Sequence, residues 1–240
     1  MVSKLHITDG NPNGPDLSNE ATVIVDRMFR ARGLLDYFED AFRELHVRLE
    51  PIDVKHLTIS LRDKPEPEPL IDSNNSVLAV QVGCGISRIV AVPCENSRLG
   101  EFFIDLVEEA LEKLNGFVEL PAELFRNVLS KYRENNYTYH FKLGERMLPG
   151  TKVKGRIDVA LACDGLRRKL TLSYRGKELS THDLIGEDQI PVHFYRFFSR
   201  FHMDGNVLTV DRASPTGEDT HIDLADFPDV MKFVEKTRTT

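Results

Sequence analysis

The 240-residue chain has no tryptophan, only three cysteines and no long apolar run. Cys84, Cys94 and Cys163 are odd in number and form no close pair, which argues against a disulfide framework and for a reducing compartment. Without about 18 consecutive apolar residues no membrane-spanning helix is predicted, and residues 1–6 lack the apolar stretch of a signal peptide. We therefore expect a cytoplasmic protein with no membrane partner.

The common catalytic and cofactor motifs are missing as well. The chain has no P-loop, no Rossmann glycine fingerprint and no Gly-x-Ser-x-Gly elbow, which argues against the commonest nucleotide-binding and hydrolase classes. No histidine pair accompanies Cys84 and Cys94, so a zinc site is not predicted. We therefore expect the protein to bind neither a metal ion nor a cofactor.

One segment does match a metal motif. Residues 9–20 satisfy the EF-hand pattern, with oxygen ligands through Glu20 and a glycine at the sixth position. The eighth position, normally aliphatic, is Asp16, and no second loop accompanies this one. We therefore expect an Asn- and Gly-rich turn before a helix, and no calcium binding.

The negative charge is concentrated in the first half of the chain. Residues 1–120 have 12 Lys and Arg against 21 Asp and Glu, whereas residues 121–240 have 19 against 17. The densest acidic stretch is read as a solvated helix face or as a surface for a basic partner; it consists of Glu101, Asp105, Glu108, Glu109 and Glu112. Because no basic stripe or nucleic-acid-binding motif is present, nucleic acid is not the expected partner.

Hydrophobic periodicity predicts both helices and strands. Helices are expected over residues 18–48, 98–115, 121–134, 191–203 and 226–236, and strands over 4–8, 54–61, 137–143, 152–163, 168–174 and 206–211. Ser97 is the expected N-cap of the second helix and Gly116 the residue that ends it. This pattern predicts an α+β protein with mixed or mainly antiparallel sheets and helices packed on them. Two lobes are expected, an acidic α/β lobe over 1–120 and a β-rich lobe over 121–240, with one continuous domain as the alternative.

Two hairpins are predicted from glycine-bearing turns. Residues 76–82 and 87–93 flank Gly83-Cys84-Gly85-Ile86, and Asp164-Gly165 joins the strands before and after it in a type I′ turn.

The segment 192–202 is rich in aromatic residues and also contains Arg196 and Arg200. Its aromatic residues cannot share one narrow helical face, so the element is either buried on several sides or presents aromatic and Arg side chains to a partner.

The strand at 54–61 alternates strictly, which places His56, Thr58 and Ser60 on one polar face. A His and a Thr two residues apart can jointly hold a phosphate, since the imidazole moves a proton while the hydroxyl donates a hydrogen bond. The strand at 137–143 alternates too and puts His140 and Lys142 on one face.

His56-Leu57-Thr58 resembles the His-x-Thr motif that two-histidine phosphoesterases repeat on two strands. The resemblance implies metal-independent phosphodiester chemistry, with one histidine as the base and the other as the acid. His140-Phe141-Lys142 would be the second motif, but it has Lys142 where the family has a hydroxyl residue. The leading expectation is therefore a non-enzymatic cytosolic protein that binds another protein, such as an inhibitor, an immunity-type or a regulatory factor. The acidic residues, Arg196 and Arg200 would contact a basic partner or a second copy of the chain, and a phosphoesterase using His56, Thr58, His140 and Lys142 is the alternative.

Overall fold

The chain is an α+β protein with mixed and antiparallel sheets, as the sequence predicts. Its computed structural model describes Val2 and residues 4–8, 30–49, 53–72, 74, 76–187, 200–211 and 218–238. The predicted turn at 9–20 lies outside these residues. The structure divides into two compact units, which are described separately. The first unit comprises Met1–Tyr139 with Ala162–Asp164, and the second comprises His140–Leu161 with Gly165–Thr240.

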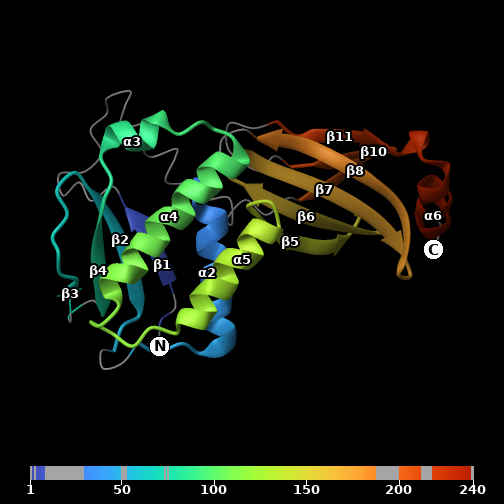
Figure 1. Ribbon diagram of the computed structural model, residues 1–240. Helices are drawn as coiled ribbons and strands as arrows, with labels where there is room; N and C mark the ends of the chain where they lie inside the picture. Colours follow the sequence, from blue (N-terminus) through green and yellow to red (C-terminus); the bar gives the residue numbers. More distant parts are fainter. Residues whose placement is uncertain are drawn as a thin grey trace. The chain divides into compact units, whose positions relative to one another are not determined.

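The first unit contains a mixed sheet in the order β1-β2-β4-β3 (Figure 1). Its strands are β1 (Lys4–Thr8), β2 (His56–Arg62), β3 (Leu70–Asp72) and β4 (Val77–Gly83). Strand β2 pairs in parallel with β1 on one side and β4 on the other, and β3 pairs antiparallel with β4. Parallel neighbours cannot be joined by a tight hairpin. The chain between β1 and β2 contains a helix that packs on one face of the sheet, whereas the chain between β2 and β4 contains β3.

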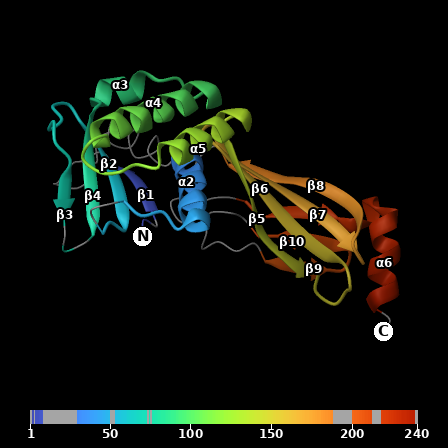
Figure 2. The ribbon, with the colours of Figure 1, turned by 60° about the horizontal axis from the view of Figure 1, so that its bottom comes forward.

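Helices of this unit pack on that face. They are α2 (Arg32–Leu45), α3 (Ile86–Ala91), α4 (Asn96–Leu114) and α5 (Ala122–Glu134). Helix α2 lies against β1, α4 lies against β4, and α5 packs on α2 (Figure 2). Together the helices cover one side of the sheet.

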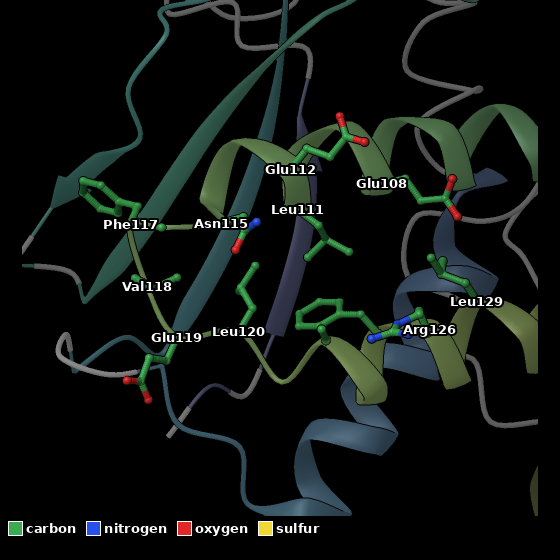
Figure 3. A pocket seen from close by; sticks show the side chains of 13 residues that line it. Glu108, Leu111, Glu112, Asn115, Phe117, Val118, Glu119, Leu120, Arg126 and Leu129 are labelled. Carbon is green, nitrogen blue, oxygen red and sulfur yellow. The ribbon is translucent and has the colours of Figure 1, made fainter.

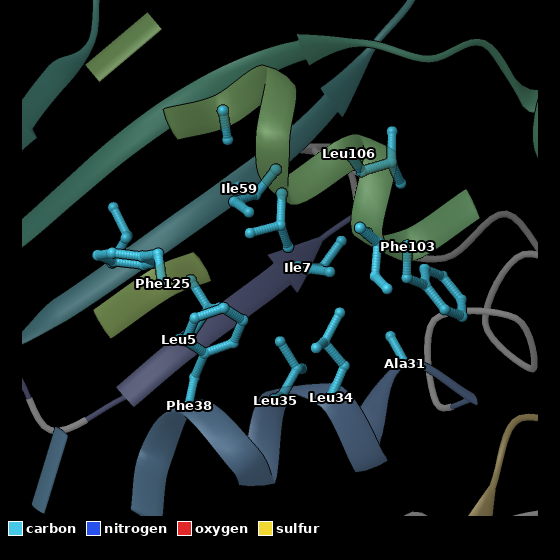
Figure 4. Close-up of a cluster of buried hydrophobic side chains, with 14 of the residues drawn as sticks. Leu5, Ile7, Ala31, Leu34, Leu35, Phe38, Ile59, Phe103, Leu106 and Phe125 are labelled. Carbon is cyan, nitrogen blue, oxygen red and sulfur yellow. The ribbon is translucent and has the colours of Figure 1, made fainter. Parts of the chain in front are cut away.

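Strict alternation along β2 explains which face the helices cover. Leu57, Ile59 and Leu61 are buried, while His56 and Thr58 on the opposite face are half-buried, which confirms the predicted separation. Figure 4 shows Leu5 and Ile7 of β1 and Ile59 of β2 pointing into a cluster with Phe38 of α2, Phe103 of α4 and Phe125 of α5. The apolar face of the sheet and the apolar sides of the helices thus form one core.

Helix boundaries follow the predicted signals in part. The described part of the helix expected over 18–48 is interrupted at Ala31, and α2 then runs from Arg32 to Leu45. Gly116, with φ +88°, ends α4 in the left-handed conformation that a glycine adopts at little cost. Ser97 is not the N-cap, because α4 begins at Asn96 with Glu95 as its cap.

The predicted hairpin over 76–93 is wrong. After β4 the chain forms the short helix α3, and the antiparallel neighbour of β4 is β3. The β-branched residues between Gly85 and Pro93 favour a strand locally, but this propensity is weak and tertiary packing overrides it. The short helix α3 buries the side chain of Ile89 and leaves that of Val90 exposed.

The second unit is mostly β. Its larger sheet has the order β5-β6-β7-β8, its smaller sheet the order β11-β10-β9, and helix α6 closes the chain (Figure 1). The elements are β5 (Thr138–Met147), β6 (Lys154–Ala162), β7 (Gly165–Tyr174), β8 (Lys177–Glu187), β9 (Phe201–Asp204), β10 (Val207–Val210), β11 (Thr220–Asp223), the 3-10 helix η2 (Leu224–Asp226) and α6 (Pro228–Arg238). Tyr174 of β7 stacks on Phe233 of α6, with ring centroids 4.6 Å apart.

The predicted hairpin between β6 and β7 is present, but its turn differs from the prediction. β6 ends at Ala162 and β7 begins at Gly165, so Cys163 and Asp164 form the tip. A type I′ turn needs positive φ at both central residues. Neither Cys163 nor Asp164 has a positive φ, so the turn is not of this type.

The helix expected over 191–203 is wrong where the structure describes it. Residues 201–203 belong to strand β9, which pairs with β10, and residues 191–199 lie outside the described part. The ring of Phe201 sits against Gly155 of β6, where a Cβ atom would come within 2.8 Å of the ring. Because Gly155 has no side chain, the ring of Phe201 fits against β6. The local sequence pattern had predicted Phe201 in a helix.

Candidate functional site

The predicted acidic residues lie along the outer side of α4. Its apolar stripe faces the sheet and buries Leu99, Phe103, Leu106 and Leu114. With 3.6 residues per turn, the remaining positions fall on the side that faces away from the core. The surroundings of the acidic residues differ, and only some of them are open to a partner.

Glu101 is engaged within the first unit. Arg133 of α5 donates from Nε to Oε1 and from Nη2 to Oε2, each at 2.9 Å, and the Tyr137 hydroxyl donates to Oε1 at 2.5 Å. The hydrogen bonds from Arg133 hold the pKa of Glu101 below its usual value, with Tyr137 adding to the effect. This carboxylate ties α4 to α5.

Glu109 and Asp105 differ in their surroundings. Glu109 accepts a hydrogen bond from the Gly83 backbone N–H at 3.1 Å, at the end of β4. Asp105 is exposed and lines a hollow of about 630 Å³ together with Arg88, Arg98 and Glu101. Glu109 therefore serves the fold, whereas Asp105 is open to solvent.

Glu108 and Glu112 line a larger groove between α4 and α5, with a volume of about 1070 Å³ (Figure 3). Its apolar lining comes from both helices and from the connection between them, and consists of Leu111, Phe117, Val118, Leu120, Phe125 and Leu129. Figure 3 shows Leu111 and Leu120 pointing toward one another across the groove. Phe117, which also lines the groove, is 37% exposed.

The rim of this groove is acidic. Glu108, Glu112 and Glu119 are exposed, and Arg126 is the cation among the lining residues. Arg126 pairs with Glu123 at 2.9 Å, which compensates its charge. Glu108 lies 3.7 Å from Arg133, whose guanidinium already forms shorter hydrogen bonds with Glu101. An apolar floor inside a negative rim suits a ligand that is both apolar and positively charged.

The predicted partner-binding arginines are Arg196 and Arg200. Arg196 lies outside the described residues, and Arg200 is exposed just before β9 in the second unit. Their predicted role in partner binding stays a prediction. Glu119 was missed as a rim residue because it follows the helix, where no periodicity places it on the α4 face.

A second candidate site lies on the polar face of the first unit's sheet. The β1–β2 register places Lys4 opposite His56, His6 opposite Thr58 and Thr8 opposite Ser60. The imidazole rings of His6 and His56 are 5.7 Å apart between centroids. The Thr8 and Ser60 hydroxyl oxygens are 3.3 Å apart and share a hydrogen bond. Two neighbouring strands thus present imidazole and hydroxyl groups side by side.

The sequence contains the signal for this pair. His6-Ile7-Thr8 has the same His-x-Thr spacing as His56-Leu57-Thr58, but it was overlooked because the strand at 4–8 is short. The predicted partner His140 lies on β5 with Lys142, and both side chains are exposed. His140 belongs to the second unit and His56 to the first, so their predicted pairing stays a prediction.

Within the described ranges, no three His, Cys, Asp or Glu side chains are grouped so that they could hold a metal ion. No helix in the same ranges is long and apolar enough to cross a bilayer. No protein-family model matches the chain, and no curated protein or solved structure shows a significant match to it. The function is therefore argued from the two sites alone.

Proposed function

We propose that the protein is a binding factor that holds a basic amphipathic segment of another protein in the groove between α4 and α5. The observation on which this rests is the pairing of an apolar floor with an acidic rim at Glu108, Glu112 and Glu119. A segment with leucine-like anchors on one face and Lys or Arg beside them would complement both features.

The apolar floor would supply most of the affinity. Leu111 and Leu120 are only half-buried and Phe117 is exposed, so an occupant can remove further apolar surface from water. Helical ligands of such grooves insert anchors at spacings of three, four and seven residues. A volume of about 1070 Å³ can hold several aliphatic side chains.

The acidic rim would supply selectivity and a faster association. Glu108 and Glu112 are one turn apart on the same side of α4, and Glu119 lies on the connection toward α5. Charges at an exposed rim mainly steer the encounter and exclude partners of like charge. Binding of a basic segment should therefore weaken as the salt concentration rises.

The test uses two synthetic helical peptides with the same leucine positions. One has lysine at all other positions and the second has glutamate, and each is titrated into the isotope-labelled protein while amide shifts are recorded. The lysine peptide should perturb residues around Leu111, Phe117 and Leu120, and the glutamate peptide should not.

A triple variant, Glu108→Gln with Glu112→Gln and Glu119→Gln, tests the rim. Loss of three partly screened charges should weaken binding of the lysine peptide about tenfold. Glu134→Gln is the matched control, since this exposed carboxylate of α5 is not among the residues that line the groove. Equal binding by the triple variant, or shifts centred elsewhere, would contradict the proposal, and self-association that blocks the peptide would point to a second copy as the occupant.

A phosphoesterase that uses His56, Thr58, His140 and Lys142 is the second candidate. It is supported by the common face of His56 and Thr58 on β2. Turnover of a phosphodiester that disappears in both His56→Ala and His140→Ala, with both variants folded, would favour this candidate. Turnover that survives His140→Ala would exclude the pair.

A further inference from the structure

We infer that the polar face of β1 and β2 binds the phosphate group of a small phosphorylated molecule through Lys4, His6, His56 and the hydroxyls of Thr8, Thr58 and Ser60. This site is separate from the α4–α5 groove and needs neither the proposed partner nor a contribution from His140. No turnover is required of it.

The register of β1 and β2 brings polar side chains together. On three successive rungs of the same face, both strands present a polar side chain: Lys4 with His56, His6 with Thr58, and Thr8 with Ser60. Each of these groups can donate a hydrogen bond, and phosphate offers only oxygen acceptors when it is fully ionised. On the middle rung, Ala79 of β4 stands beside Thr58 and has only a methyl group, so β4 adds little bulk there.

The two imidazole rings are close enough to contact one phosphate group. The His6 and His56 rings are 5.7 Å apart between centroids and tilted by 31°. A ring nitrogen reaches an acceptor at about 2.7–3.2 Å, so both rings can contact different oxygens of one phosphate. The Thr8–Ser60 hydrogen bond brings two further hydroxyls together on the neighbouring rung.

The charges around His6 also favour an anion. Burial is the largest cause that lowers the pKa of His6, and three basic neighbours, His56, Lys4 and Arg32, lower it further. Arg32 acts from α2, where it is paired with Asp36 at 2.6 Å. A cluster of mutually repelling basic groups is relieved when an anion binds between them. Protonation of His6 should then become easier.

The charge of the chain favours a small ligand over a polyanion. The chain has a net charge of -7, and its acidic excess is in the first 120 residues. A polyanion such as a nucleic acid would meet this negative field beyond the cluster, whereas a single phosphate meets only the local positive one. The site therefore fits a small molecule with one phosphate monoester.

The experiment follows the side-chain resonances of the histidines in the full-length protein during titration with inorganic phosphate. The resonances of both His6 and His56 should shift in a saturable manner, and the apparent pKa of His6 should rise on binding. Sulfate, whose charge is constant over this range, should bind more tightly as the pH falls from about 7.5 to about 5.5, because His6 becomes protonated. Sodium chloride at matched ionic strength should produce neither effect.

His6→Ala and Lys4→Met should each weaken phosphate binding about tenfold. His221→Ala is the control and should bind as the unchanged protein does, since this exposed histidine of β11 belongs to neither proposed site. Since His6 is only half-buried, His6→Ala should keep the fold, which is verified by its amide spectrum. Unchanged affinity in folded His6→Ala, or the same shifts with chloride, would overturn the inference. Tighter binding of a single-stranded oligonucleotide than of a phosphate monoester would reject the small-molecule assignment.

Peptide binding in the groove and phosphate binding at the sheet are read out at different residues. The result at Leu111 and Leu120 therefore stands whatever is found at His6 and His56, and failure of one proposal is distinguishable from failure of the other.

Discussion

Arg133 holds the Glu101 carboxylate by two parallel hydrogen bonds of 2.9 Å, from Nε to Oε1 and from Nη2 to Oε2. The two residues are on different helices, 32 positions apart in the chain. A bidentate guanidinium–carboxylate pair fixes orientation as well as distance. It therefore sets the position of α5 beside α4, and with it the width of the groove between them.

Glu101→Gln should destabilise the protein in a pH-dependent way. The folded-state pKa of Glu101 is lowered, so its contribution is present above the unfolded-state value and is lost as the pH falls through the lowered folded-state value. Both side chains are more than a third exposed, which limits the loss at neutral pH to about 1 kcal/mol. Urea unfolding from about pH 7 to about pH 3 should show the difference between variant and unchanged protein shrinking. Glu123→Gln, whose pair with Arg126 is 79% and 69% exposed, should show almost no difference at either pH.

Leu57→Ala and Ile59→Ala should each lower the free energy of unfolding by about 2–5 kcal/mol, because both side chains are buried in the core beneath α2 and α4. Ser60→Ala, on the other face of the same strand, should cost less than about 1 kcal/mol. Chemical denaturation of the three variants compares them directly. Similar losses at all three positions would mean that the polar face is covered as well.

Gly100→Ala should destabilise α4 although alanine favours helices. A Cβ atom at this position would collide with the ring of Tyr137, and the packed core leaves that ring little room to move. The expected loss is about 1–3 kcal/mol. Ser130→Ala, at an exposed position of α5, should be neutral or slightly stabilising in the same thermal melts.

The cysteines should differ sharply in reactivity. Cys94 is exposed, whereas Cys84 and Cys163 are buried. Burial raises the pKa of Cys84 and raises that of Cys163 to about 12, so few thiolates form at either residue near neutral pH. A thiol reagent should label one cysteine quickly in the folded protein and all three in denaturant. Cys94→Ser should remove the fast phase, and rapid labelling of Cys163 in that variant would contradict the structure.

The parts of the fold that were predictable depend on local patterns. The alternation along β2 and the glycine at the end of α4 act within a few residues, and both predictions are confirmed. Helix α3 and strand β9 were misassigned because non-local packing decides them. Ile89 is buried in the core of the first unit, and Phe201 packs on Gly155 of another strand. Local propensity contains no information about such neighbours.

In the candidate sites, too, local sequence patterns place some residues and tertiary structure places the others. The acidic positions of α4 were visible in the sequence, but the partner of Glu101 lies 32 residues away and depends on how two helices cross. The groove rim at Glu119 and the pairing of His6 with His56 likewise depend on tertiary structure. The repeated His-x-Thr spacing was available from the sequence, and only the parallel register of β1 and β2 shows that the two copies are neighbours.

Residues Ala162–Asp164 belong to the first unit, although they lie more than twenty positions after Tyr139, where the rest of that unit ends. The Cys163 carbonyl accepts from Arg30 at 2.9 Å, its N–H donates to Asn96 at 2.8 Å, and its thiol is hydrogen-bonded to Tyr132 at 3.1 Å. A fragment that stopped at Tyr139 would leave buried groups of Arg30 and Tyr132 without these hydrogen bonds. During synthesis the first unit therefore cannot be completed until the ribosome has passed the β6–β7 turn, and a shortened expression product should fold poorly by itself.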